Sequence, residues 1–358
     1  MVQRLLSPGE IESLDHTTIP RLVLPQPGVL FSARATRLRQ LADGNVPGIP
    51  APDSLHGYLY LMAAVADAQA AIAAAGSPAA ASRPAASAPR PPAPPVPPLP
   101  PSDAMETALA HNMPPLPVSG PRPAGWGAIY LALLDQLDAA ASGQPQLAAV
   151  LAGLRALSDT DLEGCADAVL AEFGEGINPL HAPFVAAALQ LLWVTHASQL
   201  DASRVQPPVT GTLCPVCGSH PLASVIRIGG QAQGYRYLHC AICASEWHMV
   251  RVKCSCCEKN ARIAYQSLAP AGADTGADED SGGDPAAAPV NKAQDPSRVA
   301  RAETCDDCRS YRKIFNQEHD FMVEPLADDL ASLALDVLVT EAGYARGSVN
   351  PLLWFGSE

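Results

Sequence analysis

Four Cys-x-x-Cys pairs constrain the fold of this chain more than any other feature of its sequence. The pairs are Cys214/Cys217, Cys240/Cys243, Cys254/Cys257 and Cys305/Cys308. One such pair presents two sulfurs from a single tight turn, and two pairs complete a tetrahedral metal site. In a reducing compartment this pattern favours metal binding over a disulfide framework. We therefore expect two metal sites, each with four cysteine ligands.

The compartment is inferred from what the sequence does not contain. The first residues include no hydrophobic stretch of signal-peptide length. No uncharged apolar run reaches the roughly 20 residues of a membrane helix; the best candidate, residues 183–194, is too short. We therefore expect a cytoplasmic protein that does not contact a membrane.

The order of the pairs along the chain predicts which cysteines share a metal ion. We expect the first two pairs to form one site and the last two pairs to form the other. A crossed arrangement, with Cys214/Cys217 and Cys254/Cys257 around one ion, is also compatible with the sequence. Tetrahedral thiolate sites accept zinc, which would be structural, or iron, which would be redox-active. The expected cofactors are two ions of iron or zinc.

Other sulfur and imidazole groups require separate interpretations. Cys256, inside the third pair, is interpreted as a spectator thiol, although it is also able to replace a neighbouring ligand. His220, His239 and His248 lie close to the pairs, but four thiolates already complete each site. Cys165 falls on the apolar face of a predicted helix, as expected for a small core residue.

Helical periodicity is clear before the cysteine-rich part. Apolar residues recur at helical spacing in residues 126–137 and 147–154. Ser158 is the predicted N-cap of a third helix that ends near Gly174. Residues 184–193 are apolar nearly all round, which predicts a buried central helix.

Short strands and turns are predicted around the cysteines. The expected strands are residues 224–228, 235–239, 247–253, 262–265 and 311–315. Residues 328–340 are predicted to form one C-terminal helix. The fold class is therefore α+β and multidomain: a helical N-terminal domain, two rubredoxin-like or zinc-ribbon-like metal-binding modules with four cysteines each, and a C-terminal helix.

Changes in composition predict the domain organisation. Prolines and alanines dominate the first linker, and Ala, Gly, Asp and Pro without periodicity indicate a disordered insertion later in the chain. The expected segments are a helical segment (1–72), a Pro/Ala-rich linker (73–123), a helical domain (124–205), the first four-cysteine module with the start of the second (206–265), the acidic insertion (266–300) and the rest of the second module with the C-terminal helix (301–358).

Several stretches together resemble the formate dehydrogenase accessory (FdhE-type) proteins. The residues that carry the resemblance are CPVCGSHP (214–221), RYLHCAICASEWH (236–248), VRVKC (250–254), ETCDDC (303–308), ADDLASL (327–333) and SVNP (348–351). A looser similarity includes Arg34 and Arg37. The linker and the insertion are longer than expected of the family, and Cys256 is an extra cysteine.

The resemblance implies a cytoplasmic, non-catalytic maturation factor with rubredoxin-like metal knuckles. Such a protein binds the catalytic subunit of a respiratory formate dehydrogenase and promotes its assembly into the active form. The sequence contains no phosphate-binding glycine loop and no Gly-x-Ser-x-Gly elbow, so we expect no enzyme activity.

Two alternative functions remain compatible with the sequence. One is a nucleic-acid-binding zinc ribbon, because residues 212–265 carry six basic and two acidic side chains. The acidic residues on both sides of this segment would repel a phosphate backbone, which argues against nucleic acid as a partner. The other is an iron-dependent redox factor.

Overall fold

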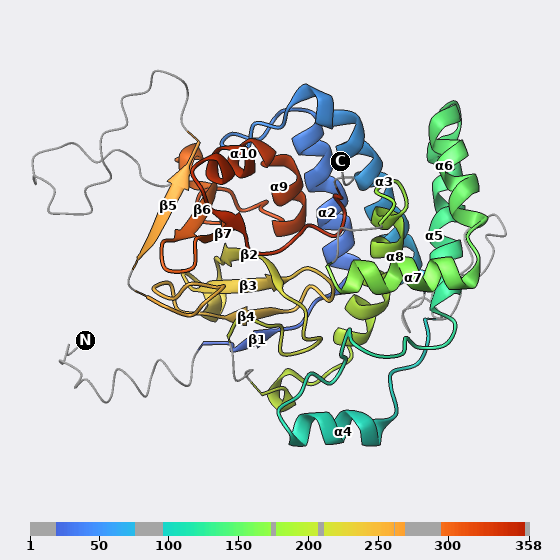
Figure 1. Cartoon of the computed structure of the whole chain (residues 1–358), viewed down its shortest axis with the longest axis horizontal. Helices are drawn as coiled ribbons and strands as arrows, with labels where there is room; N and C mark the ends of the chain where they lie inside the picture. Colours follow the sequence, from blue (N-terminus) through green and yellow to red (C-terminus); the bar gives the residue numbers. More distant parts are fainter. Residues whose placement is uncertain are drawn as a thin grey trace, which may run out of the picture.

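The computed structural model describes residues 19–75, 96–172, 177–206, 211–260, 262–268 and 295–354. Helices from the first part of the chain pack beside a sheet that carries the cysteines (Figure 1). The predicted α+β class is confirmed by this mixed arrangement of helices and strands. Most of the predicted acidic insertion lies outside the described residues, as do residues 76–95 of the predicted linker.

The helical part is built around one fully packed helix. Its helices are α2 (Pro27–Ala42), α3 (Asp53–Ala75), α5 (Trp126–Ala141), α6 (Pro145–Arg155), α7 (Asp159–Leu170) and α8 (Ala182–Ala197). The side chains of α8 are buried almost without exception, and α8 packs against α3, α5 and α7. The predicted central helix is therefore confirmed. In Figure 1, α5 and α6 lie on the side of the molecule away from the sheet.

The helix boundaries follow local signals, with two differences. The Ser158 hydroxyl accepts a hydrogen bond from the Asp161 N–H at 3.2 Å, as the predicted cap requires. The helix ends at Leu170, earlier than predicted. On α6 only Leu151 and Leu154 of the predicted stripe are buried, because α6 lies at the periphery and packs mainly on α5.

Part of the proline-rich segment folds against the rest of the protein. Residues 102–110 form helix α4 (Ser102–Ala110), which has no buried residue. Further on, Leu116 is buried, and its N–H donates to the Val216 carbonyl at 3.0 Å. The high proline content obscured this helix and these contacts in the sequence. The boundaries of the domains themselves stay a prediction.

Helix α3 is the single helix among the described residues that is long and apolar enough to cross a membrane. Its sequence includes Asp53 and Asp67, so the uncharged-run criterion did not select it. It packs against α2, α5, α8 and α9, and 44% of its most apolar window is buried. Core helices satisfy the same length and composition test, so the apolar character of α3 is weak evidence for a membrane span.

The strands form one continuous sheet. They are β1 (Leu22–Val23), β2 (Pro221–Ile226), β3 (Arg236–Cys240), β4 (Glu246–His248), β5 (Ile263–Ser267), β6 (Ala300–Cys305), β7 (Ser310–Asn316) and β8 (Ala345–Arg346). Their order is β1-β4-β3-β2-β7-β6-β5, and β8 also pairs with β7. Strand β4 is shorter than predicted, and β6 is a strand in addition to the predicted ones. The sequence of β6, ARAETC, contains few hydrophobic residues. Pairing with β5 and β7 holds it in the sheet.

Two similar modules build this sheet. In each, a Cys-x-x-Cys turn precedes three antiparallel strands, and a second Cys-x-x-Cys turn joins the second strand to the third. The first module contains β2, β3 and β4, and the second contains β5, β6 and β7. Parallel pairing of β2 with β7, for example Ser224 opposite Ile314, joins the modules edge to edge. The sequence predicted both modules but not their union in one sheet.

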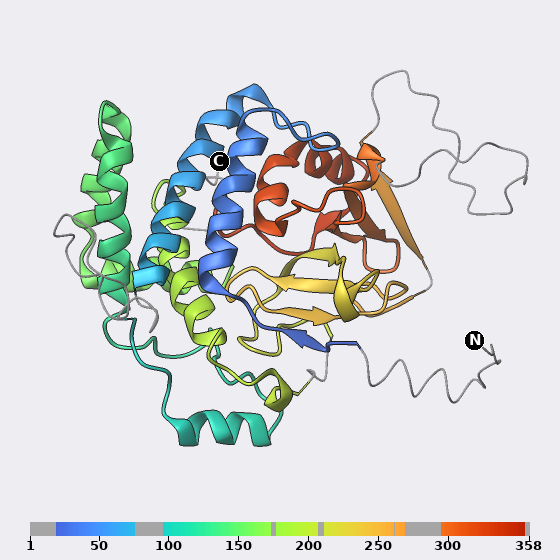
Figure 2. The same cartoon turned by 180° about the vertical axis from the view of Figure 1, so that it is seen from behind.

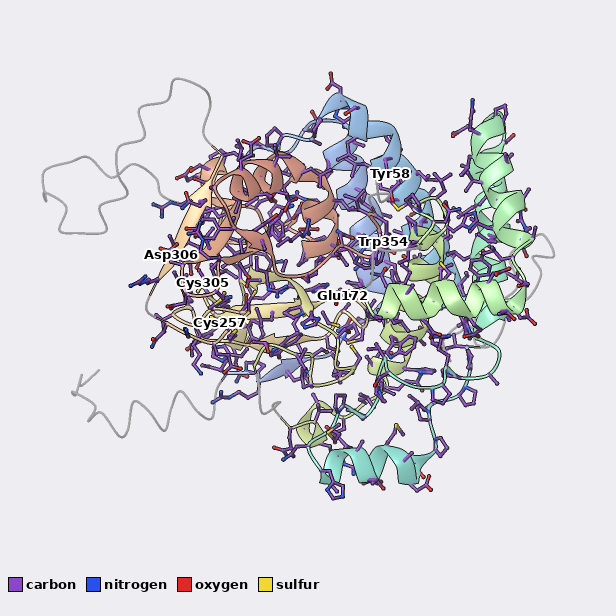
Figure 3. All side chains as sticks on the ribbon, in the orientation of Figure 1. Tyr58, Glu172, Cys257, Cys305, Asp306 and Trp354 are labelled. Atoms are coloured by element: carbon purple, nitrogen blue, oxygen red, sulfur yellow. The ribbon has the colours of Figure 1, made fainter. Side chains whose placement is uncertain are left out.

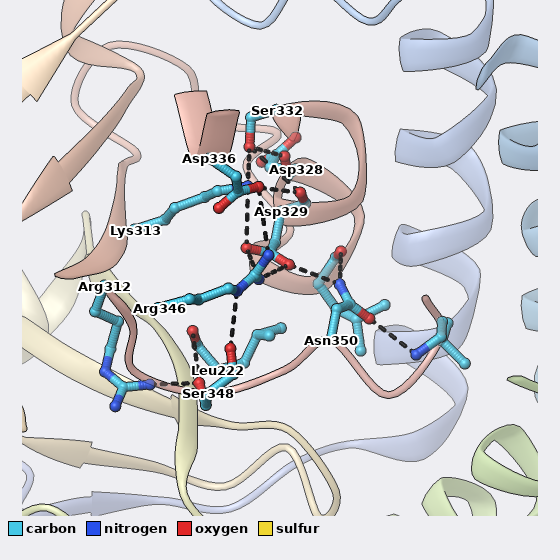
Figure 4. Close-up of polar contacts among 12 residues, drawn as sticks. Leu222, Arg312, Lys313, Asp328, Asp329, Ser332, Asp336, Arg346, Ser348 and Asn350 are labelled. Carbon is cyan, nitrogen blue, oxygen red and sulfur yellow. Dashed lines mark hydrogen bonds and ion pairs between the residues drawn. The ribbon is translucent and has the colours of Figure 1, made fainter. Parts of the chain in front are cut away.

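The C-terminal helix is interrupted, so the prediction of one continuous helix is wrong. Helix α9 (Pro325–Ala331) ends before α10 (Leu333–Glu341), and Ser332 separates them. The buried Lys313 ammonium donates to the Asp329 carbonyl at 2.9 Å and to the Ser332 hydroxyl at 3.0 Å (Figure 4). This contact from β7 satisfies a carbonyl at the end of α9, which a helix prediction from local sequence could not include.

Buried ion pairs connect the two ends of the chain. Arg34 of α2 pairs with Glu324 at 2.9 Å, and Arg37 pairs with Asp328 of α9 at 2.6 Å. Helix α2 stands between α3 and the C-terminal segment when seen from behind (Figure 2). Residues that carry the family resemblance at opposite ends of the sequence therefore meet in the fold.

Candidate metal centres

The first two Cys-x-x-Cys turns, here called knuckles one and two, bring four sulfurs together at centre one. Centre one contains Cys214, Cys217, Cys240 and Cys243, whose Sγ atoms all lie within 4.8 Å of one another. The Cys214–Cys243 and Cys217–Cys240 sulfur distances are 3.5 and 3.4 Å. All four residues are at most 1% exposed. Centre one is therefore a closed site inside the protein.

The last two Cys-x-x-Cys turns, knuckles three and four, form centre two in the module of β5, β6 and β7. Centre two contains Cys254, Cys257, Cys305 and Cys308, again with all Sγ atoms within 4.8 Å. The Cys254–Cys308 and Cys257–Cys305 sulfur distances are both 3.8 Å. Cys257 and Cys308 are partly exposed, and Figure 3 shows Cys257 and Cys305 on the side of the molecule away from α5 and α6. The structure thus groups the cysteines in the sequential arrangement and not in the crossed one.

Both sets of sulfurs fit a tetrahedral metal ion. Metal–sulfur bonds of about 2.3 Å in a tetrahedron give sulfur–sulfur edges of about 3.8 Å, close to the distances in both centres. Burial raises the pKa of the Cys214 and Cys243 thiols, and it raises the pKa of Cys257 to about 12. Four adjacent thiolates are therefore unfavourable without a cation, which would neutralise them. The residues present fit zinc or iron, and their chemistry does not distinguish the two metals.

The backbone of the four knuckles is alike. The residue after the second cysteine has a positive φ in every case: 81° at Gly218, 54° at Ala244, 62° at Glu258 and 54° at Arg309. In knuckles one to three, the N–H of the first cysteine donates to the carbonyl five residues later at 2.8 to 3.0 Å. Glycine adopts this left-handed conformation without strain, whereas other residues do so at a cost. The knuckle geometry therefore does not depend on glycine.

Serine hydroxyls contact the sulfurs of centre one. Ser219 Oγ lies 2.8 Å from the sulfur of Cys217, and Ser245 Oγ lies 3.3 Å from that of Cys243. Both serines are buried and follow the second cysteine of a knuckle by two residues. Ser310 occupies the same place in knuckle four. The Cys-x-x-Cys-x-Ser pattern is therefore the sequence signal for these contacts.

Residues of the helical part hold centre one from outside the sheet. The Gln190 side chain on α8 donates to the Ala241 carbonyl, within knuckle two, at 2.7 Å. The Leu116 and Val118 N–H groups donate to the carbonyls of Val216 and Cys217 in knuckle one at 3.0 and 2.9 Å. Centre one is consequently part of the packing between the helices and the sheet. These contacts join segments far apart in sequence, so no local signal could have indicated them.

The three histidines near the knuckles belong to neither sulfur group among the described residues. His239 Nδ1 lies 2.8 Å from Glu246, and His220 Nδ1 lies 3.3 Å from Glu172. The ring of His248 packs edge-on against Tyr235 and Tyr237. Each histidine thus has another role in the fold.

The two remaining cysteines are also placed outside the sulfur groups. Cys165 is partly buried against the main core. Cys256 lies beside centre two, with its sulfur 3.6 Å from Arg312 Nη2.

Comparisons with known proteins identify the family. Models of the FdhE N-terminal, central and C-terminal domains match residues 19–210, 213–251 and 287–353. Protein FdhE of Escherichia coli strain SMS-3-5 is 34% identical over 99% of this chain and 98% of its own length. The chain belongs to the FdhE family. Protein FdhE of Shigella boydii serotype 18 is similarly 35% identical over 99% of this chain and 98% of that protein.

A solved structure agrees with this assignment. The crystal structure of the FdhE protein from Pseudomonas aeruginosa has 34% sequence identity to this chain and a TM-score of 0.70. The match covers 94% of this chain and all of that chain. The FdhE fold therefore extends over both the helical part and the two cysteine modules.

Proposed function

We propose that this FdhE-family protein is an accessory factor that binds the catalytic subunit of a respiratory formate dehydrogenase and promotes its assembly into the active form. The observation that carries the proposal is the full-length match to FdhE proteins in a chain whose eight paired cysteines gather into two groups. The family match supports a formate dehydrogenase accessory role. The particular client subunit is part of the proposal.

The eight grouped cysteines are the proposed ligands of two metal ions, one at each centre. A bound ion would supply a cross-link between two knuckles and neutralise their thiolates. The chain's own residues do the rest: strand pairing presents the sulfurs, and serine hydroxyls and backbone N–H groups stabilise them at centre one. We propose that the resulting rigid sheet is a platform for the immature subunit.

The proposed role is non-catalytic and cytoplasmic. Both cysteine groups have four ligands each, without the open position that a catalytic metal site keeps for substrate. Several basic side chains of the proposed ribbon segment are paired internally: Arg227 Nε donates to Glu246 at 2.7 Å, and Arg236 pairs with Glu303 at 2.7 Å. This pairing reduces the positive charge available to a nucleic acid.

The test is an anaerobic pull-down of the tagged full-length protein from extract of the cells that encode it, with mass spectrometry of the captured proteins. We expect a formate dehydrogenase catalytic subunit to be enriched whether or not the extract is treated with nuclease. An unrelated protein with the same tag is the control for non-specific capture. Nuclease-sensitive recovery of ribosomal or DNA-bound proteins, without that subunit, would contradict the proposal and favour the nucleic-acid-binding alternative.

Metal content of the same preparation tests the second part of the proposal. Elemental analysis should give two ions of zinc or iron per chain. Colourless, zinc-loaded protein would indicate structural centres, whereas an iron absorbance that bleaches with reductant would favour a redox factor. A metal-free, folded protein that still captures the subunit would show that the centres are not needed for its function.

A further inference from the structure

We propose that Arg312 is a positioning residue for centre two, where its buried guanidinium balances the negative charge of the metal-bound thiolates. Backbone N–H groups contact sulfurs at both centres, but the described side chains beside the sulfurs of centre one are serine hydroxyls rather than a guanidinium. This inference rests on the proposed metal binding at the two cysteine groups. The inference assigns a role to Arg312, which is not one of the proposed ligands. It also predicts that the metal affinity of centre two depends on this residue, whereas that of centre one does not.

Several contacts fix the position of Arg312 next to knuckle three. The residue lies on β7 and is 3% exposed. Its Nε donates to the Ser255 hydroxyl at 3.0 Å, and its Nη2 lies 3.6 Å from the Cys256 sulfur. Ser255 and Cys256 are the two residues between the ligands of knuckle three. The guanidinium therefore supports the whole turn that presents those ligands.

The other side of the guanidinium is held by the C-terminal segment. Nη1 donates to the Ser348 hydroxyl at 2.6 Å, as Figure 4 shows, and Nη2 donates to the Gly347 carbonyl at 3.4 Å. A Cβ atom on Gly347 would lie 2.6 Å from the Cys256 sulfur and 3.0 Å from Arg312 Nη2. The backbone at residue 347 therefore packs directly on this pair, which leaves the guanidinium little freedom to move.

No carboxylate forms an ion pair with Arg312 in the described parts of the chain, since all of its hydrogen bonds go to neutral groups or to sulfur. Nearby, the buried Arg236 is paired with Glu303 at 2.7 Å. Among the described residues, Glu172 lies 3.3 Å from His220 and acts on Arg312 only through its Coulombic attraction, without a hydrogen bond or ion pair to the guanidinium. Arg236, Arg312 and Glu303 together thus carry one excess positive charge. An unbalanced buried charge is costly, so a compensating negative group is expected beside it.

A metal centre supplies that negative charge. Four thiolates around a divalent ion carry a net charge of −2, and around a trivalent ion −1. Hydrogen bonds and charges just outside the ligands stabilise such centres, and their removal typically lowers metal affinity by about 10- to 100-fold. Arg312 is therefore placed both to orient knuckle three and to offset the charge of its thiolates.

Centre one is stabilised by different groups. Its sulfurs contact the hydroxyls of Ser219 and Ser245, and the Cys240 sulfur accepts from the N–H groups of Ile242 and Cys243 at 3.4 Å. Among the described residues, the groups that contact these sulfurs are thus hydroxyl and backbone N–H groups rather than a guanidinium. Loss of Arg312 should therefore affect one centre and not the other.

The experiment is a chelator competition on the full-length protein loaded with zinc, which counts the ions retained as chelator concentration rises. Wild type should retain two ions. Arg312→Met should lose one of them at a chelator concentration about 10- to 100-fold lower than wild type requires, while the other ion is retained as before. Arg312→Lys keeps the charge and should partly restore the affinity.

Matched controls separate this role from a general loss of stability. Arg37→Met removes another buried arginine, one that pairs with Asp328 of α9 rather than with a knuckle, and should leave both zinc affinities unchanged. Cys256→Ser should also retain two ions, because Cys256 is not one of the proposed ligands. Cobalt-loaded Arg312→Lys should keep the absorption of two tetrathiolate sites, a signature that stability alone does not determine.

The possible results have distinct meanings. Wild-type protein that binds no metal would remove the proposed function and this inference together. Wild type with two ions and an Arg312→Met variant with the same two affinities would overturn the inference alone. If Arg312→Met does not fold, equal zinc affinities in wild type and Arg312→Lys, Ser255→Ala and Ser348→Ala variants would overturn it. Loss of one ion from Cys256→Ser would instead make Cys256 a ligand and Arg312 its partner.

Discussion

Centre one and centre two have the same four-cysteine pattern but different surroundings. The cysteines of centre one belong to the main hydrophobic core, which also contains the helices. Centre two lies outside that core, beside a small cluster formed by Ala302, Tyr311, Leu335 and Val339. Two of its cysteines are partly exposed. The comparison shows that a local motif presents the sulfurs, whereas the distant elements that cover them determine how closed a site becomes.

The groups that stabilise the two centres also differ. Gln190 and residues 116–118 connect centre one to the helical part by hydrogen bonds to its knuckles. At centre two, Arg312 contacts Ser255 of knuckle three, and the C-terminal segment packs on Arg312 through Gly347. We therefore expect damage to centre one to affect the whole fold and damage to centre two to remain more local.

Loss of a ligand should give the largest difference between the centres. Cys240→Ser removes a thiolate from the main core, and we expect it to lower the free energy of unfolding by more than about 4 kcal/mol, because metal-binding energy is folding energy. Cys257→Ser should cost less, because centre two lies outside the core. Thermal unfolding with metal analysis of each variant measures this. Equal losses from both substitutions would break the proposed contrast.

A substitution on α8 should weaken centre one without touching a ligand. Gln190→Ala leaves the Ala241 carbonyl without its donor, and we expect a loss of about 1 to 3 kcal/mol in the free energy of unfolding. Zinc release from one of the two centres should become faster. Gln69→Ala is the matched control, since Gln69 is an equally buried amide that donates to Ala187 on α8, away from the knuckles. Equal changes in zinc release from Gln190→Ala and Gln69→Ala would show that the hydrogen bond to knuckle two does not stabilise centre one.

Metal release from the wild-type protein should have two phases. Cys257 and Cys308 are accessible to a chelator, whereas the centre one cysteines require the core to open. We expect the rates to differ by about tenfold or more, equivalent to about 1.4 kcal/mol in activation free energy. A colorimetric chelator with stopped-flow detection measures the two rates. A single phase that releases both ions would show that exposure does not distinguish the centres.

Backbone substitutions after the knuckles should have the smallest effects. Gly218→Ala places a side chain at φ 81°, and Ala244→Gly removes one at φ 54°. We expect the first to destabilise and the second to stabilise the protein, each by about 1 kcal/mol. Denaturant unfolding of the two variants tests this. Changes of the same sign would show that the left-handed conformation is not the controlling factor in these turns.

Much of the site could be predicted because its signals are local. Two cysteines three residues apart must be presented by one turn, so the eight grouped residues were visible without a structure. The Ser158 cap and the apolar circumference of α8 were equally local. A serine also follows the second cysteine by two residues in three of the four pairs. Its role becomes clear only in the structure, where the hydroxyls of Ser219 and Ser245 contact cysteine sulfurs.

Other features depended on partners that the sequence does not place. Helix α4 is obscured by prolines, and the break at Ser332 depends on Lys313 from β7. The parallel pairing of β2 with β7 cannot be recognised from the sequence of either strand. The pairing is made by backbone hydrogen bonds, and these are the same whichever strand is the partner.

The sequence by itself determined the sulfur pairs, most of the helices and the family, since each is encoded by spacing or periodicity over a few residues. Only the tertiary structure decided that both modules share one sheet, that the helices enclose centre one and that Arg312 supports centre two. The physical reason is distance along the chain. Contacts such as that between Arg34 and Glu324, 290 residues apart, form only after the whole chain has folded.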